Sequence, residues 1–418
     1  MLRKVLAFFI FFSLLVVFSK SDVEILIDKL VEKGILTEEV ANEIYDEIRA
    51  EREVEAESQK YVYDEKLIKD EIKKEMLEMM PSWLKNIQFY GDMRLRYEWS
   101  HKSDSENRKR ECLRLRLNVK TKLNKQWEVG FGLTTGKNPR SGNITFDDAF
   151  DKENIEISHA YIQYSPFSCL KIWGGKYYDI KKALWCPSSL LWDYDIRPEG
   201  GGIIFNYKNS AVNYFTNAGF FMIDEEKNNS DPIMAYIQPG IKLNFSSSFY
   251  SRFAFTYYLM RSVRGHSLSY SAGTNTRDAS GNLKYSYTSF GLSAELGWKN
   301  LFSKIEYFSL IGDYIYNFDP NSDNQGFLAG VKLGNKNIYK KGAWQLTANY
   351  RYLERDAWLD TFPNSSSYSG STNQKGYYFH LKYGLNKNVA VGCTYCRNDR
   401  IKGNEHSDAF KTDLMVKF

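Results

Sequence analysis

The last nine residues of the chain alternate between two kinds of side chain. One set would share a face of a strand: Phe410, Thr412, Leu414, Val416 and Phe418. The polar or flexible residues between them would share the other face, because successive side chains of a strand point in opposite directions. A final strand with one apolar face and a terminal aromatic residue is typical of outer-membrane barrels. We expect Phe410, Leu414, Val416 and Phe418 to form the signal that barrel-assembly machinery reads.

The same period of two recurs from residue 86 to the end of the chain. We expect strands near residues 86–99, 108–122, 125–135, 155–165, 169–178, 200–208, 210–222, 233–245, 249–261, 283–298, 301–315, 325–335, 341–354, 375–386, 388–399 and 408–418. No segment after residue 20 has the roughly 18 consecutive apolar residues that a membrane-spanning helix needs. The pattern therefore predicts an all-β fold, a transmembrane antiparallel up-and-down β-barrel of about 16 strands over residues 82–418.

The connections between the predicted strands alternate in length. Tight turns such as 208–210 and 246–248 alternate with long polar connections such as 136–154 and 262–282. Outer-membrane barrels have short turns in the periplasm and long loops outside the cell. A soluble propeller or β-helix would also contain many strands, but neither requires this alternation. An even number of strands would place both chain ends on the periplasmic side.

The chain begins with two segments that lack the strand pattern. Arg3 and Lys4 precede an apolar run, 5–18, and small residues follow it, so we expect residues 1–21 to be a secretory signal peptide. Residues 22–81 carry apolar stripes at helical spacing. We expect them to form a helical segment in the periplasm, either a solvated spacer or a module for oligomerisation or for contact with the cell wall.

Charge and composition agree with this division. Residues 21–80 hold 9 basic and 19 acidic residues, whereas the chain after residue 80 carries a net charge of +12. Aromatic residues make up 16% of the chain, which suits a barrel with aromatic girdles at both membrane interfaces. Of the five cysteines (112, 169, 186, 393 and 396), Cys393 and Cys396 would lie on opposite faces of a strand and could not chelate a metal together.

Arginines occupy one face of the first two predicted strands. Arg94 and Arg96 alternate with apolar residues, and so do Arg114 and Arg116. One arginine facing lipid at mid-depth costs about 2–4 kcal/mol, so exposing all four would cost on the order of 10 kcal/mol. We therefore expect them to face the lumen. The other basic residues predicted to line the channel are Lys120, Lys242, Arg252, Lys304, Lys332, Arg351 and Lys382.

The width of the lumen follows from the number of strands. About sixteen strands enclose more space than their own side chains can fill, so we expect the lumen to hold water. A basic wall in such a lumen attracts anions and repels cations. The alternative is that these charges form cross-strand ion pairs that only stiffen the wall. Small solutes or anions are the expected cargo.

The connection at residues 179–199 is unusually apolar for a water-exposed loop. We expect it to pack against something, either inside the pore as a constriction, or over the rim, or on a neighbouring protomer. In the pore it would bring both signs of charge and two indole rings to the narrowest point. The residues concerned are Lys181, Lys182, Trp185, Trp192, Asp193, Asp195 and Arg197.

Catalytic and metal-binding patterns do not occur in the sequence. The histidines at 101, 159, 266, 380 and 406 lack ligand spacing, and no phosphate-binding loop or hydrolase motif is found. We expect no catalytic residue, metal, cofactor or nucleic-acid partner. Two other functions stay open: a barrel enzyme of lipase or protease type with a Ser–His or Asp–His pair at the rim, and a structural tether that grips the cell wall through residues 22–80.

Several segments together resemble a known family. Phe-Tyr-Gly-Asp-Met-Arg-Leu-Arg-Tyr at 89–97, Trp-Gly-Gly-Lys at 173–176, Leu-Trp-Asp-Tyr-Asp at 191–195 and Arg-Pro-Glu-Gly at 197–200 are similar to the putative porins of Gram-negative outer membranes. The resemblance spans nearly the whole chain. It implies a diffusion channel in the outer membrane, surrounded by lipid, monomeric or homotrimeric, with the third long loop constricting the pore. The surplus of basic lumen residues also resembles phosphate- and anion-selective porins.

Overall fold

The computed structural model describes residues 20–54, 68, 72, 79–103, 105–147, 149–150, 152–302 and 305–418. By its internal contacts the chain divides into two compact units, residues 1–81 and 82–418. Nearly all of the predicted signal peptide lies outside the described residues. Within the described part, no helix has the length and apolar character needed to span a membrane.

The first unit contains a short helical hairpin. Helix α2 (Lys20–Glu32) is followed by a second helix that covers residues 38–54. The side chain of Ile27 is fully buried between the two helices. The hydroxyl of Tyr45 on the second helix donates to the carbonyl oxygen of Glu24 on the first, at 3.2 Å. The buried side chain of Ile27 and this hydrogen bond together hold the two helices side by side.

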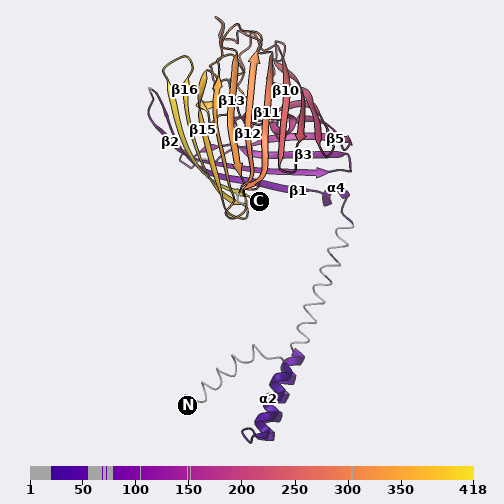
Figure 1. Ribbon diagram of the computed structural model, residues 1–418. Helices are drawn as coiled ribbons and strands as arrows, with labels where there is room; N and C mark the ends of the chain where they lie inside the picture. Colours follow the sequence, from indigo (N-terminus) through magenta and orange to yellow (C-terminus); the bar gives the residue numbers. More distant parts are fainter. Residues whose placement is uncertain are drawn as a thin grey trace. The chain divides into compact units, whose positions relative to one another are not determined.

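The second unit is a closed antiparallel barrel of sixteen long strands (Figure 1). The long strands are β1 (Gln88–Lys102), β2 (Arg108–Lys122), β3 (Trp127–Thr135), β5 (Ile155–Phe167), β6 (Leu170–Lys176), β7 (Glu199–Lys208), β8 (Val212–Met222), β9 (Ile233–Asn244), β10 (Phe249–Arg261), β11 (Ser289–Phe302), β12 (Ile305–Asn317), β13 (Gln325–Gly334), β14 (Trp344–Leu353), β15 (Gln374–Asn386), β16 (Val389–Arg400) and β17 (His406–Lys417). Three short elements complete the unit: helix α4 (Ser82–Lys85), strand β4 (Ile144–Thr145) beside β2, and helix α5 (Ile180–Ala183). The predicted barrel is confirmed, and every predicted strand overlaps an observed one.

The alternation of side chains decides which face of each strand meets lipid. On β1, Met93, Leu95 and Tyr97 are exposed on the outer wall, whereas Glu98 points inward and is buried. The same parity holds on β17, where Phe410 and Leu414 are exposed and Lys411 and Asp413 are buried. A closed cylinder leaves no strand edge unpaired, which a membrane requires.

The connections are short at one end of the barrel and long at the other. The long ones include residues 136–154, 177–198, 262–288 and 354–373. One connection on the short side departs from the expected pattern, because residues 335–343 form a nine-residue link. Ile338 of this link is buried in a small apolar cluster at the base of the barrel, which explains the extra length.

Gly91 allows the last residue to close the barrel. The N–H of Gly91 donates to the carbonyl oxygen of Phe418 at 2.8 Å, and the N–H of Phe418 donates back to Gly91 at 3.2 Å. A Cβ atom on Gly91 would lie 2.5 Å from the carbonyl oxygen of Arg116 and 2.5 Å from the ring of Phe418. Only glycine therefore fits between the first and the last strand at this position.

We expect Gly91→Ala to destabilise the closed barrel by about 1–3 kcal/mol, because the added methyl group overpacks the seam. The temperature at which the folded band converts to the unfolded band on an SDS gel should fall. Gly174→Ala is the matched control, since a Cβ there would have no atom within 4 Å. Equal conversion temperatures for the two variants would contradict the prediction.

Candidate functional site

Residues 177–198, the connection between β6 and β7, lie inside the barrel. The N–H of Trp185 donates to a glutamine of β9 at 2.7 Å, and the carbonyl oxygen of Pro187 accepts a bond from a lysine of β13. Asp195 pairs with arginines of β2. Because β2, β9 and β13 stand on different sides of the barrel, the segment crosses the lumen. We call residues 177–198 the lumen loop.

The first half of the lumen loop carries two exposed lysines and a half-buried indole. Lys181 lies over the ring of Tyr194, 4.3 Å from its centroid, and Lys182 is exposed. The ring of Trp185 stacks under the guanidinium of Arg252 on β10, at 4.2 Å. Lys181 and Lys182 therefore stay accessible, whereas Trp185 fastens the loop to the wall.

The second half of the lumen loop is anchored by an aromatic cluster. The ring of Trp192 is 2% exposed and meets Trp358 edge-on, with centroids 5.6 Å apart. Asp193 accepts a hydrogen bond from the N–H of Ser365 at 2.7 Å. Arg197 donates to two carbonyl oxygens of its own loop. These contacts join the loop to residues 354–373 as well as to the barrel.

Four arginines of β1 and β2 face inward and meet three carboxylates. Asp92 accepts from both Arg114 and Arg116 at 2.8 Å, and Asp195 lies 3.4 and 3.2 Å from the same two side chains. On the neighbouring strand Arg96 forms a two-pronged pair with Asp413, at 2.7 and 2.9 Å.

Most of the arginine charge is therefore compensated within the wall. The remaining member, Arg94, donates to Asn143 at 2.6 Å and lies 3.9 Å from Asp413. The ion pairs that the sequence left as an alternative are present, so these four residues by themselves do not make a strongly basic lumen.

The pKa values of Asp193 and Asp195 in the lumen loop are shifted in opposite directions. Burial opposes ionisation of Asp195, but Arg114 and Arg116 outweigh it and hold the pKa of Asp195 below its usual range. Burial, together with the charge of Asp195, raises the pKa of Asp193. A lowered pKa stabilises the fold above the unfolded value of about 3.9, and this contribution is lost as the pH falls through the folded value. The ion pairs of Asp195 with Arg114 and Arg116 should therefore persist in moderately acidic media.

Three lysines gather on the side of the lumen loop that faces the short turns of the barrel. Lys382 of β15 lies within electrostatic reach of Lys181, Lys417 and Arg94, and also of Asp413. Lys417, the penultimate residue, lies 4.3 Å over the ring of Tyr339. Among the described residues, no carboxylate oxygen lies within 4.0 Å of any of these three ammonium groups. We call Lys181, Lys382 and Lys417 the lysine cluster.

The other predicted lumen residues are more enclosed than expected. Lys242 and Lys120 lie over tyrosine rings, at 3.9 and 5.7 Å. Arg252 is sandwiched between two aromatic rings, and Lys332 donates to the lumen loop. Arg351 is only 2% exposed. Lys304 lies outside the described residues.

An apolar core occupies part of the lumen. A continuous apolar core joins inward side chains of β5, β6, β8–β10 and β12–β14 to residues of three loops, namely 177–198, 262–288 and 354–373. Loop residues such as Leu190, Leu283 and Trp358 are buried in this core. The charged residues of β1, β2, β15 and β17 therefore border the part of the lumen that stays polar.

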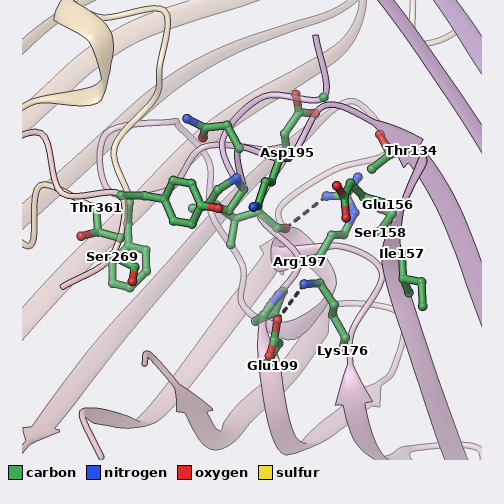
Figure 2. A pocket seen from close by; sticks show the side chains of 18 of the residues that line it. Thr134, Glu156, Ile157, Ser158, Lys176, Asp195, Arg197, Glu199, Ser269 and Thr361 are labelled. Atoms are coloured by element: carbon green, nitrogen blue, oxygen red, sulfur yellow. Dashed lines mark hydrogen bonds and ion pairs between the residues drawn. The ribbon is translucent and has the colours of Figure 1, made fainter. Parts of the chain in front are cut away.

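A cavity of about 480 Å³ opens above the arginines (Figure 2). Its floor contains Asp195 and Arg197, and Lys176 forms an ion pair with Glu199 at 2.7 Å on one side. Ser269 and Thr361 lie across the cavity from the side chains of β5 and β6. We call this cavity the vestibule, because it is built from the long-loop end of the barrel.

Sequence reasoning missed several residues of the lumen. Asp92 lies on the alternating face of β1 and could have been recognised as the partner of Arg114 and Arg116. Lys417 has the right parity but was considered only as part of the terminal strand. Arg140 and residues 354–373 gave no periodic signal, and their positions depend on contacts between distant loops.

A Ser–His pair does occur at the rim, although no local pattern predicts it. The hydroxyl of Ser103 lies 2.9 Å from Nδ1 of His406, but it also accepts from the N–H of His406 at 2.6 Å. These bonds tie the outer ends of β1 and β17 together. Among the described residues, no carboxylate bonds to His406 as a third member. The pair therefore serves to join the two strand ends.

The cysteines and the last strand complete the predicted residues. All five cysteines are free thiols, and Cys393 and Cys396 have opposite parity on β16. Within the described residues, no group of three His, Cys, Asp or Glu side chains could hold a metal. On the outer wall of β17, Phe410, Leu414 and Phe418 are exposed and Val416 is half-buried.

Comparison with known proteins adds independent information. A family model described as "Putative porin" matches residues 99–294 and 302–418. OprB of Pseudomonas putida has a similar structure, with a TM-score of 0.53, 9% identity, and coverage of 83% of this chain and 96% of that chain. OmpF of Salmonella typhi, solved in complex with daunomycin, has a TM-score of 0.50, 12% identity, and coverage of 80% and 98%. No curated protein sequence matches the chain.

Proposed function

Because the chain belongs to the putative porin family, we propose that its channel prefers anions. The protein is an outer-membrane porin, a water-filled channel through which small hydrophilic solutes diffuse. Solutes diffuse through the water-filled part of the lumen, past its charged wall. We propose that no catalytic step accompanies their passage. Under this proposal no cofactor or metal takes part.

The lysine cluster is the observation that supports the anion preference. The arginines of β1 and β2 are largely compensated by Asp92, Asp195 and Asp413. Among the described residues, Lys181, Lys382 and Lys417 form no ion pair within 4.0 Å, and Asp413 and Asp92 act on Lys382 and Lys417 only from a greater distance, so we infer that much of their charge acts on the solution in the lumen. Rings of lysine or arginine attract anions in pores.

We expect the wild-type channel to show an anion-selective reversal potential in a KCl gradient across a planar bilayer. Changing Lys181, Lys382 and Lys417 to Gln should lower the ratio of chloride to potassium permeability by about threefold, since three positive charges leave the lumen. Lys125, Lys208 and Lys387 changed to Gln form the control, because they are exposed at the short-turn end of the barrel. Cation selectivity in the wild type would contradict the proposal, and an unchanged ratio in the first variant would remove the role of the cluster.

Several further assignments complete the proposal. Residues 1–21 act as a signal peptide, and residues 22–81 lie in the periplasm. Outer-membrane lipid surrounds the apolar outer wall, and the assembly machinery binds the C-terminal strand through Phe418 and its neighbours. The barrel associates as a homotrimer. Native mass spectrometry of the detergent-extracted protein tests the trimer, and a monomer would contradict it.

A further inference from the structure

The outer end of the lumen is covered by three connections that meet above the lumen loop. They are residues 136–142, 262–288 and 354–373, which together we call the lid. Their meeting point is Arg140, which is 6% exposed. Its guanidinium donates to three backbone carbonyl oxygens, those of Asp360 at 3.0 Å, Gly370 at 2.8 Å and Tyr270 at 3.0 Å. One side chain therefore holds all three parts of the lid.

The approach of Arg140 requires glycine at position 370. Gly370 has a φ of +79°, in the left-handed region, and a Cβ there would collide with the guanidinium. In addition the carbonyl oxygen of Arg140 accepts from the hydroxyl of Ser365 at 3.1 Å. The backbone and the side chain of Arg140 thus both bind residues 354–373.

Two buried carboxylates hold the larger parts of the lid together. Asp360 accepts from the hydroxyl of Ser271 at 2.7 Å and from the N–H groups of Thr274 and Asn275 at 2.6 and 3.1 Å. Asp356 accepts from the N–H of Thr276 at 2.8 Å. A buried carboxylate is costly unless its oxygens are hydrogen-bonded, so this arrangement favours one conformation of the lid.

The lid also forms part of the vestibule. Pro139, Tyr270 and Thr361 line the cavity, and Thr361 lies on the side opposite β5 and β6 (Figure 2). The vestibule is therefore bounded by the barrel wall on one side and by the lid on the other. Its width depends on the position of the lid.

We propose that Arg140 determines which solutes enter the porin by size, because it holds the lid against the vestibule. This inference rests on the proposed channel function, and it is independent of the anion preference because it concerns neutral solutes as well. Arg140 is a positioning residue in this role, since it acts through the carbonyl groups of the lid. Two nitrogens of its planar guanidinium donate to carbonyl oxygens of different segments. The single ammonium group of a lysine cannot reproduce this geometry.

Liposome swelling with neutral sugars of increasing size tests the proposal. In Arg140→Gln the swelling rate for raffinose relative to arabinose should rise by about threefold, because the lid is no longer held and the vestibule widens. Arg140→Lys should lie between the wild type and Arg140→Gln. Arg264→Gln, an exposed residue of the same lid, is the control and should match the wild type.

A second substitution, at Gly370, disturbs the same contact between Arg140 and residues 354–373. Gly370→Ala should displace the guanidinium and raise the raffinose rate, and combining it with Arg140→Gln should add little. A folded band of normal heat stability on SDS gels establishes that each barrel is intact. Unchanged relative rates in folded Arg140→Gln and Gly370→Ala would overturn the proposal. Failure of wild-type liposomes to admit arabinose would instead contradict the channel function.

Discussion

Trp358→Ala is expected to lower the free energy of unfolding by about 3–5 kcal/mol. The indole is completely buried in the apolar core inside the lumen. Its ring centroid lies 4.7 Å from that of Tyr258 on β10, and its N–H donates to the carbonyl oxygen of Leu191 at 3.0 Å. Removing it leaves a cavity and an unpaired carbonyl group between the lid and the lumen loop.

Urea unfolding of the detergent-solubilised barrel measures this loss. Trp83→Ala is the control, because that side chain is 44% exposed on α4, and it should change the stability by less than about 0.5 kcal/mol. Single-channel conductance of the Trp358 variant should also increase, since the lid loses its main apolar anchor. Stability equal to that of the control would show that the core in the lumen contributes little.

Asp195→Asn is expected to increase the chloride-to-potassium permeability ratio by about threefold and to cost about 3 kcal/mol of stability. The carboxylate lies between Arg114 and Arg116, which then keep only Asp92 as an acidic partner. Two partly buried guanidinium groups would share one negative charge. The lumen would gain an uncompensated positive charge at the crossing of the loop.

Reversal potentials and urea unfolding, measured on the same preparation, check both effects. Asp278→Asn is the matched control, because Asp278 is exposed in the lid and its acceptor bonds to backbone N–H groups can be kept by an asparagine oxygen. Because the pKa of Asp195 is lowered, the wild type should resemble the variant only when the pH falls well below about 3.9. An identical permeability ratio in both variants would show that Asp195 does not influence selectivity.

The barrel itself could be predicted because its information is local. Each strand alternates residue by residue, and the cost of facing Arg94 or Arg114 toward lipid selects the register without knowledge of any partner. The predicted boundaries of β2 and β10 agree with the structure at both ends. The length of the alternating segment and the alternation of its side chains were sufficient to predict the bounds of these two strands.

The interior of the barrel could be predicted only in part. The apolar character of residues 179–199 indicated that they pack against something, and the structure places them across the lumen. The pairing of Asp195 with β2 could not be read from the sequence, because 79 residues separate it from Arg116. Residues 354–373 contain the similar apolar run Ala357-Trp358-Leu359, which could have indicated a second loop folded inward.

The hydrogen bonds between Gly91 and Phe418 also restrict when the wall can be sealed during biosynthesis. The first strand pairs on one side with β2 and on the other only with the final strand. A nascent polypeptide that does not yet include β17 cannot offer this partner. The whole of β17 must therefore be synthesised and reach the membrane before the first strand acquires its second neighbour.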